Sequence, residues 1–360
     1  MLSHAITKLL RSWFQLPALA LLIIALAGGS LTTSGYILGD MAENGVSADT
    51  TEQAETDPDA PPPTPPDAWG PVSIHLEDVE YPHPVSFFHL SQHGKDLRMA
   101  YMDVAPESAA NGQTVVLLHG LNFFGEYWDT TIDALTDAGF RVVVPDQIGF
   151  GRSSKPIIPY SFNKKASNTK KLLGELGIDE AAIVGHSMGG MAATRFALLY
   201  PETTTHLALV NMIGKEDFRL LRPWEDTDDV YQAELERSYD EIRQGQEDYY
   251  VEWDEEYAKY IRIHYGWTQS GDFPRLARVR ALNRQMVYSE PVVYDWQHIE
   301  TPALVIGGEE DGPDFPELAA NTAEELPNGE LVLFEDVGHN PHFEAPELFF
   351  PELIAFLEDS

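Results

Sequence analysis

The chain has 360 residues, 43% of them hydrophobic, and it carries 58 acidic against 23 basic side chains, for a formal net charge of −35 at pH 7. This length and hydrophobic content suffice for a large globular core. The negative charge excludes a surface that follows nucleic-acid phosphates or anionic lipids. Because the chain has no cysteine, it offers no disulfide, thiolate metal site or cysteine nucleophile.

Residues 1–27 have the pattern of an export signal. A positively charged start precedes an apolar run over residues 16–27, which ends in Ala-Leu-Ala. The run is shorter than the about 20 apolar residues of a membrane span, and an uncleaved anchor that extends through Leu31 is the alternative. We therefore expect an exported protein, periplasmic or extracellular, that meets a membrane only if this segment is kept as an anchor.

Residues 28–70 are rich in Asp, Glu, Thr and Pro, most of all from residue 40 onward. Such a segment cannot bury enough apolar surface to offset the entropy lost on folding. It is predicted to be a disordered, acidic, proline-rich tether, with the folded part beginning near Pro71.

From there, short runs rich in β-branched and aromatic residues alternate with helical stretches. Eight runs are predicted to be strands, at residues 85–90, 97–104, 114–118, 140–145, 181–184, 206–210, 303–306 and 331–334. The first two are joined by His93-Gly94 and predict a hairpin. Several later runs are continuously apolar, as in a parallel sheet that is covered on both faces. The pattern predicts an α/β fold with a mostly parallel eight-stranded sheet flanked by helices.

A serine stands between glycines where one of these strands becomes a helix, in the stretch AAIVGHSMGGMAATRF over residues 181–196. Small residues at Gly185 and Gly189 let the backbone turn sharply, so that Ser187 projects its hydroxyl above the sheet. The start of the following helix adds oriented N–H groups. Ser187 is therefore the predicted nucleophile.

A serine hydroxyl needs a base to take its proton, and the base needs an acid to hold it. Asp311 follows the predicted strand at 303–306, and His339 follows the one at 331–334. Because the carboxyl ends of parallel strands meet at one edge of a sheet, these loops are expected to converge on Ser187. His342 is the alternative base and Asp314 the alternative acid. Asn211, which follows the strand at 206–210, is neutral and cannot serve as the acid.

Such a triad also needs N–H donors for the oxyanion that forms at the attacked carbonyl. One donor is predicted to be the Met188 N–H, directly after the nucleophile. The other is the Leu121 N–H, in the loop after the strand at 114–118. The chain lacks a phosphate-binding loop motif and zinc-ligand histidine spacing, so we expect no metal and no cofactor.

Five segments resemble the α/β-hydrolase fold superfamily, in particular serine hydrolases with a helical cap. They read HGLNFFGEYW, VVVPDQIGFGRSSKP, VGHSMGGMAATRFALLYP, VIGGEEDG and DVGHNPHFEAPELF, and the likeness covers roughly residues 75–360. The resemblance implies hydrolysis at an acyl carbon by Ser187, His339 and Asp311, without metal or organic cofactor. The chain departs from many members in having only residues 314–329 between the acidic loop and the last strand.

Between Gly214 and Trp296 the strand rhythm stops and helices are predicted. We expect residues 214–296 to form a helical cap over the carboxyl edge of the sheet, between two core segments at 71–213 and 297–360. One helical face is predicted to carry Tyr231, Leu235, Tyr239 and Ile242. Because few basic residues are available there to hold a carboxylate or phosphate, an uncharged, largely apolar substrate is expected.

These features predict a serine hydrolase that acts on a small, mostly apolar ester through an acyl-enzyme. Two alternatives stay open. One is a carbon–carbon bond hydrolase of the same fold, and the other is a ligand-binding member with little turnover. A small molecule is the expected partner in all three.

Overall fold

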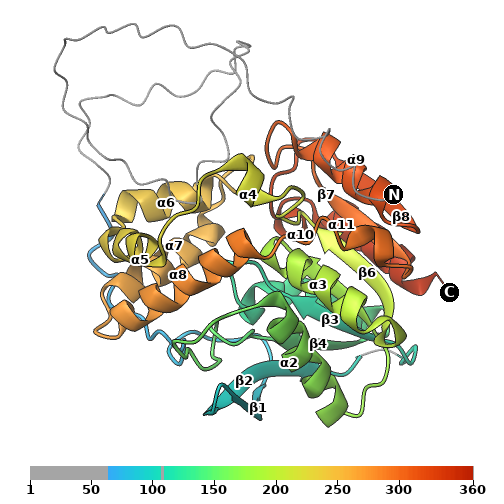
Figure 1. Ribbon diagram of the computed structural model, residues 1–360, viewed down its shortest axis with the longest axis horizontal. Coiled ribbons are helices and arrows are strands. Elements are labelled where there is room, and N and C mark those ends of the chain that lie inside the picture. Colours follow the sequence, from blue (N-terminus) through green and yellow to red (C-terminus); the bar gives the residue numbers. More distant parts are fainter. Residues whose placement is uncertain (1–63, 107–108, 360) are drawn as a thin grey trace, which may run out of the picture. The chain divides into compact units, whose positions relative to one another are not determined.

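A computed structural model describes residues 64–106 and 109–359 (Figure 1). The predicted export signal and residues 28–63 of the predicted tether lie outside the described residues. In the described end of that tether, the Trp69 N–H donates to the Pro66 carbonyl, and the Trp69 ring packs edge-on against Tyr239. Within the described ranges, no helix has the length and apolar character needed to cross a membrane.

An eight-stranded sheet lies at the centre of the fold, so the predicted fold class is confirmed. The strand order is β1-β2-β4-β3-β5-β6-β7-β8; β2 runs antiparallel to β1 and β4, and every other pair is parallel. The strands are β1 (Val85–Gln92), β2 (Lys95–Val104), β3 (Thr114–Leu118), β4 (Arg141–Pro145), β5 (Ala181–His186), β6 (Thr204–Val210), β7 (Ala303–Gly308) and β8 (Gly329–Phe334).

The predicted hairpin joins β1 to β2 through two residues with positive φ angles, His93 at 49° and Gly94 at 69°. Two-residue turns of this kind match the right-handed twist of the strands they connect. The turn therefore sets the register in which Gln92 faces Lys95.

Both faces of the sheet are buried, because alternate strand residues enter two separate apolar clusters. In β3, Val116 and Leu118 belong to one cluster, and Val115 and Leu117 belong to the other. Helices α2 (Phe162–Glu175), α3 (Met188–Leu199) and α9 (Phe315–Glu325) cover the first face, and α1 (Asp129–Asp137) and α11 (Pro346–Glu358) cover the second. Burial on both faces explains why the strands read as continuous apolar runs.

The segment between β6 and β7 forms helices and no strand, and these helices gather on one side of the molecule in Figure 1. They are α4 (Phe218–Leu221), α5 (Thr227–Glu236), α6 (Tyr239–Glu247), α7 (Ala258–Thr268) and α8 (Phe273–Ser289). Short 3₁₀ turns occupy Gly125–Trp128, Pro201–Thr203, Glu255–Tyr257 and Trp296–His298, and α10 (Pro341–Glu344) follows β8. The boundaries of the cap at 214 and 296 stay a prediction.

The prediction of one helical face from Tyr231 to Ile242 is wrong, because α5 and α6 are separate helices. Ser238 begins the second helix with a capping box. Its Oγ accepts the Glu241 N–H at 3.2 Å, and the Glu241 carboxylate accepts the Ser238 N–H at 2.7 Å. A reciprocal cap of this kind starts a new helix even where the apolar spacing continues across it.

Candidate active site

Ser187 lies at the sharp turn from β5 into α3, with φ 55° and ψ −122°. This left-handed region is strained for a residue with a side chain and is common at functional sites. The backbone is held there on both sides: the Ser187 N–H donates to the Val210 carbonyl at 3.0 Å, and the Ser187 carbonyl accepts the Gly190 N–H at 3.0 Å. These two hydrogen bonds hold Ser187 in its strained conformation, which places the hydroxyl at the carboxyl edge of the sheet.

The two glycines of this turn are required by close backbone approach. A methyl group on Gly185 would overlap the Gly189 carbonyl, and one on Gly189 would overlap the Leu118 carbonyl of β3. The helix start thus packs directly on the neighbouring strand, as the sequence predicted for a tight strand–turn–helix.

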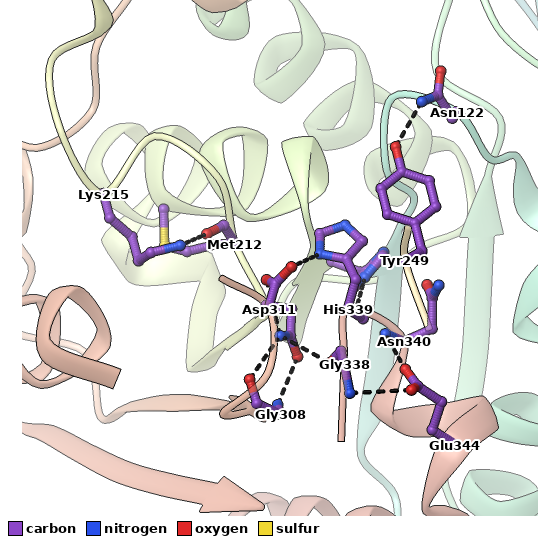
Figure 2. A network of polar contacts seen from close by, with 12 residues as sticks. Asn122, Met212, Lys215, Tyr249, Gly308, Asp311, Gly338, His339, Asn340 and Glu344 are labelled. Carbon is purple, nitrogen blue, oxygen red and sulfur yellow. Dashed lines mark hydrogen bonds and ion pairs between the residues drawn. The ribbon is translucent and has the colours of Figure 1, made fainter. Parts of the chain in front are cut away.

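The loops after β7 and β8 bring the predicted acid and base together. His339 Nδ1 lies 2.8 Å from Asp311 Oδ1, as Figure 2 shows. An Nδ1–H donated to the carboxylate leaves Nε2 as the nitrogen that can accept a proton. In the described part of the chain, neither His339 Nε2 nor Ser187 Oγ has a hydrogen-bond partner, so the structure joins the acid to the base but does not bond the serine to the base.

Asn211, at the end of β6, orients the acid. Its Nδ2 donates to Asp311 Oδ2 at 3.0 Å, and its Oδ1 accepts the Gly308 N–H at 3.2 Å. Asn211 is fully buried and has a φ of 37°. The residue that the sequence excluded as an acid therefore holds the acid instead.

His186 connects the serine turn to the two other loops of the site. Burial, together with nearby His339 and His342, lowers the pKa of His186 well below its usual value, so its ring is neutral. Its Nε2 lies 2.8 Å from the His339 carbonyl and therefore carries the proton. Its Nδ1 then accepts the Tyr127 hydroxyl at 3.1 Å, and the oxygen of that hydroxyl accepts the Gly120 N–H at 3.2 Å.

The two predicted oxyanion donors lie on backbones that meet at the serine. A methyl group on Gly120 would lie 3.1 Å from Ser187 Cβ, so the loop that carries Leu121 runs against the predicted nucleophile. Met188 is the first residue of α3, and its N–H therefore has no partner within the helix. Across residues 64–106 and 109–359, neither the Leu121 N–H nor the Met188 N–H donates to another loop or side chain.

Tyr249, which lies between α6 and α7, contacts the histidine in two ways (Figure 2). The two rings stack with centroids 4.7 Å apart and planes 21° from parallel, and the Tyr249 carbonyl accepts the His339 N–H at 2.8 Å. The Tyr249 hydroxyl accepts a hydrogen bond from Asn122 Nδ2 at 2.7 Å. Sequence reasoning missed Tyr249, since no local motif marks it.

Glu344 fastens the loop that carries the histidine. Its carboxylate accepts the backbone N–H groups of Gly338 at 3.1 Å and Asn340 at 3.0 Å, on either side of His339, and that of Val251 at 3.0 Å. Burial raises the pKa of Glu344 against these hydrogen bonds. In the sequence, the only sign of this role is that an acidic residue, Glu344, follows His339 by five positions.

The alternative base and acid have other surroundings. His342, in α10, is 1% exposed, and both of its ring nitrogens are buried without a hydrogen-bond partner. Burial and the nearby His339 lower the pKa of His342 to about 3. Asp314 precedes α9, and its side chain bonds to no histidine of the described residues. The structure therefore brings neither alternative into the Asp311–His339 pair.

The chain belongs to the alpha/beta hydrolase family, whose model matches residues 115–352. It is 40% identical to a "probable hydrolytic enzyme" of Pseudomonas aeruginosa PAO1, over 81% of this chain and 99% of that one, with a TM-score of 0.78. It is 26% identical to the AB hydrolase superfamily protein YfhM of Bacillus subtilis (strain 168), over 72% of this chain and 94% of that protein.

A shorter stretch of 128 residues is 36% identical to a 2-hydroxy-6-oxononadienedioate/2-hydroxy-6-oxononatrienedioate hydrolase of Paraburkholderia phymatum. This stretch covers 34% of the chain and 43% of that enzyme. The fold and these relatives define the protein as a hydrolase.

Proposed function

We propose that the protein is a serine carboxylic ester hydrolase that forms an acyl-enzyme on Ser187. The observation that carries this proposal is the Asp311–His339 hydrogen bond of 2.8 Å, on loops that meet the strained serine turn. The neutral His186 supports it, because that ring ties the serine turn to the carbonyl of His339.

In the proposed reaction, Ser187 Oγ attacks the ester carbonyl while His339 Nε2 takes its proton. The oxyanion accepts the Leu121 and Met188 N–H groups, and Asp311 stabilises the imidazolium. His339 then gives the proton to the leaving alcohol. Water attacks the acyl-enzyme with His339 as base, which releases the acid and restores the serine. The hydroxyl must come within bonding distance of His339 Nε2 for this step, and catalytic hydrogen bonds often tighten only when substrate is bound.

Aromatic side chains around the site support a mostly apolar acyl group. Phe123, two residues after Leu121, packs at ring-centroid distances of 4.8 Å from Tyr127, 5.1 Å from Tyr260 and 5.7 Å from Tyr249. This apolar packing beside the serine turn favours a small organic ester whose body is apolar.

The test uses the full chain and 4-nitrophenyl esters of graded acyl length. Ser187→Ala is expected to lower kcat by about 10⁴-fold or more, and to abolish labelling by a fluorophosphonate, because the nucleophile is lost. Ser289→Ala, at an exposed serine at the end of α8, is the matched control. Comparable turnover by Ser187→Ala and the unchanged protein would remove the assignment.

Carbon–carbon bond hydrolysis is the second candidate, favoured by the 36% identical stretch shared with the dienedioate hydrolase. The same triad would serve this reaction. Product analysis separates the two: a higher kcat/KM on a 2-hydroxy-6-oxo-dienoate than on any aryl ester favours carbon–carbon cleavage, and the reverse order favours the esterase.

A further inference from the structure

The helices between β6 and β7 gather three arginines around one buried glutamate, and of these arginines Arg237 is half-buried. Arg280 and Arg284, on α8, each donate through Nε to the carboxylate of Glu234 on α5, at 2.7 Å. The three side chains are only 8%, 9% and 3% exposed. Although burial opposes it, these arginines and Arg237 hold the pKa of Glu234 well below its usual range, so the glutamate is charged. We call these four residues the arginine cluster.

The arginine cluster carries two positive charges in excess. In the described part of the chain, Glu234 is the only carboxylate that pairs with Arg280 or Arg284, and Arg237 forms no ion pair or hydrogen bond with any carboxylate. Neighbouring Tyr249 and His264 do not balance it, because burial raises the pKa of the tyrosine and lowers that of the histidine, which leaves both neutral. Excess positive charge that is partly withdrawn from water favours the binding of an anion.

Several charged donors of the cluster have no acceptor. A guanidinium has five N–H donors, and Glu234 takes only the Nε–H of Arg280 and that of Arg284. Arg280 Nη2 donates to Asn122 Oδ1 at 3.1 Å. Among residues 64–106 and 109–359, the terminal nitrogens of Arg284 and Arg237 have no partner in the protein and stay accessible, and Arg237 Nε is buried without a partner. The cluster is thus an incomplete anion site.

Contacts connect the arginine cluster to the candidate active site. Asn122 follows Leu121, and both line one small cavity together with Arg280. Asn122 also donates to the Tyr249 hydroxyl, and the Tyr249 ring stacks on His339 (Figure 2). Two hydrogen bonds and one ring stack therefore connect the Arg280 guanidinium to His339.

We propose that the arginine cluster binds a carboxylate group of the substrate, at the end remote from the ester bond. This inference rests on the proposed function and narrows it to esters that are apolar in the middle and anionic at one end. A carboxylate fits because its two oxygens match the fork of a guanidinium. The expectation of an uncharged substrate rested on the small number of basic residues in the cap, whereas folding gathers three of them in one place.

Binding without turnover is tested on the full chain carrying Ser187→Ala. Calorimetry is expected to detect adipate but not dimethyl adipate, and Arg237→Gln is expected to weaken adipate about tenfold to a hundredfold, by loss of one charged pair. Arg237 makes no hydrogen bond in the described residues, so its replacement breaks none, and Arg237→Lys should restore part of the affinity. Absent or equal binding of the two compounds overturns the proposal and leaves the proposed function standing.

Steady-state kinetics then show whether the bound carboxylate belongs to the acyl part or to the alcohol part of the ester. Mono-4-nitrophenyl adipate is compared with 4-nitrophenyl hexanoate, and 4-carboxyphenyl hexanoate with phenyl hexanoate. In one of these pairs the anionic ester should have the higher kcat/KM. Arg284→Gln should lower the ratio of kcat/KM for the anionic ester to kcat/KM for its uncharged partner about tenfold to a hundredfold. Arg278→Gln, on the same helix but paired with Asp228 at the surface, is the control. A ratio that neither Arg237→Gln nor Arg284→Gln changes means that the cluster is structural, and the proposal fails.

Discussion

At the scale of single residues, the side-chain amide of Asn211 orients Asp311, the predicted acid. Asn211→Ala removes the 3.0 Å hydrogen bond to Asp311 and frees that carboxylate to rotate. Hydrogen bonds to charged groups contribute about 1.5–3 kcal/mol. We therefore expect kcat on an aryl ester to fall about tenfold or more, with KM little changed, in steady-state kinetics.

Asn211→Asp separates this orienting role from a purely structural one. A second carboxylate beside Asp311 adds negative charge next to the imidazole, which favours the protonated form of the ring. The acidic limb of the kcat/KM profile should then move to higher pH. A profile that keeps its wild-type shape, together with an unchanged kcat in Asn211→Ala, would contradict the orienting role.

Local chemistry decides which site residues a sequence can reveal. Ser187 is marked by its glycines, and Asp311 and His339 by their positions just after strands. Tyr249 carries no such mark, because its contact with His339 depends on how a distant helical segment folds back over the sheet. The same holds for Arg237, whose unpaired charge exists only once α5 and α8 are packed together.

At the scale of elements, the junction between β5 and α3 is the least tolerant part of the fold. A methyl group on Gly189 would overlap the Leu118 carbonyl, which belongs to a rigid strand. Gly189→Ala should therefore destabilise the protein by several kcal/mol, on the order of the largest single-substitution effects, or prevent folding. Gly174→Ala is the matched control, since nothing lies within 4 Å of the added methyl in α2.

That control should raise stability by about 0.5–1 kcal/mol, because alanine favours helix over glycine. Urea unfolding measures both changes. Equal stability of Gly189→Ala and Gly174→Ala would mean that the strand and helix do not approach as closely as described.

Strands were easier to predict than helices. The central runs stand out because burial on both faces keeps most of their residues apolar, as in β3 and β7. The edge strands β1 and β8 are partly exposed, and their β-branched and aromatic residues marked them instead. The break between α5 and α6 was missed because the 3.6-residue spacing continues through Ser238, and only the reciprocal bonds with Glu241 end one helix and begin the next. Apolar spacing reports which residues are buried, and it is weak evidence for where a helix ends.

At the scale of the whole molecule, neutral buried histidines make stability depend on pH. The pKa of His342 is about 3 in the folded chain, because of burial and His339, against about 6.5 when unfolded. Between these values only the unfolded chain binds the proton, so the free energy of unfolding falls by about 1.4 kcal/mol for each pH unit of acidification. This stability is fully present above pH 6.5.

His342→Phe should remove the part of the pH dependence of the free energy of unfolding that comes from His342. Urea unfolding between pH 5 and 6.5 is expected to show a mean slope smaller by about 1 kcal/mol per pH unit, since the unfolded histidine is only half protonated at pH 6.5. Stability at pH 7 should be unchanged or higher, since two unpaired buried nitrogens are lost. His89→Phe, at an exposed position on β1, is the control. An identical slope in His342→Phe and the parent protein would show that His342 takes up its proton when folded.

The hydrogen bond from the His339 N–H to the Tyr249 carbonyl has a mechanical consequence. Any motion that lifts Tyr249 off the sheet must break this bond or drag the imidazole away from the serine. The proposed site is therefore complete only while the segment that carries Tyr249 stays in place over the sheet. If substrate entered and product left by lifting this segment, each cycle would displace the His339 imidazole from the serine. Entry from the side would leave the imidazole in place.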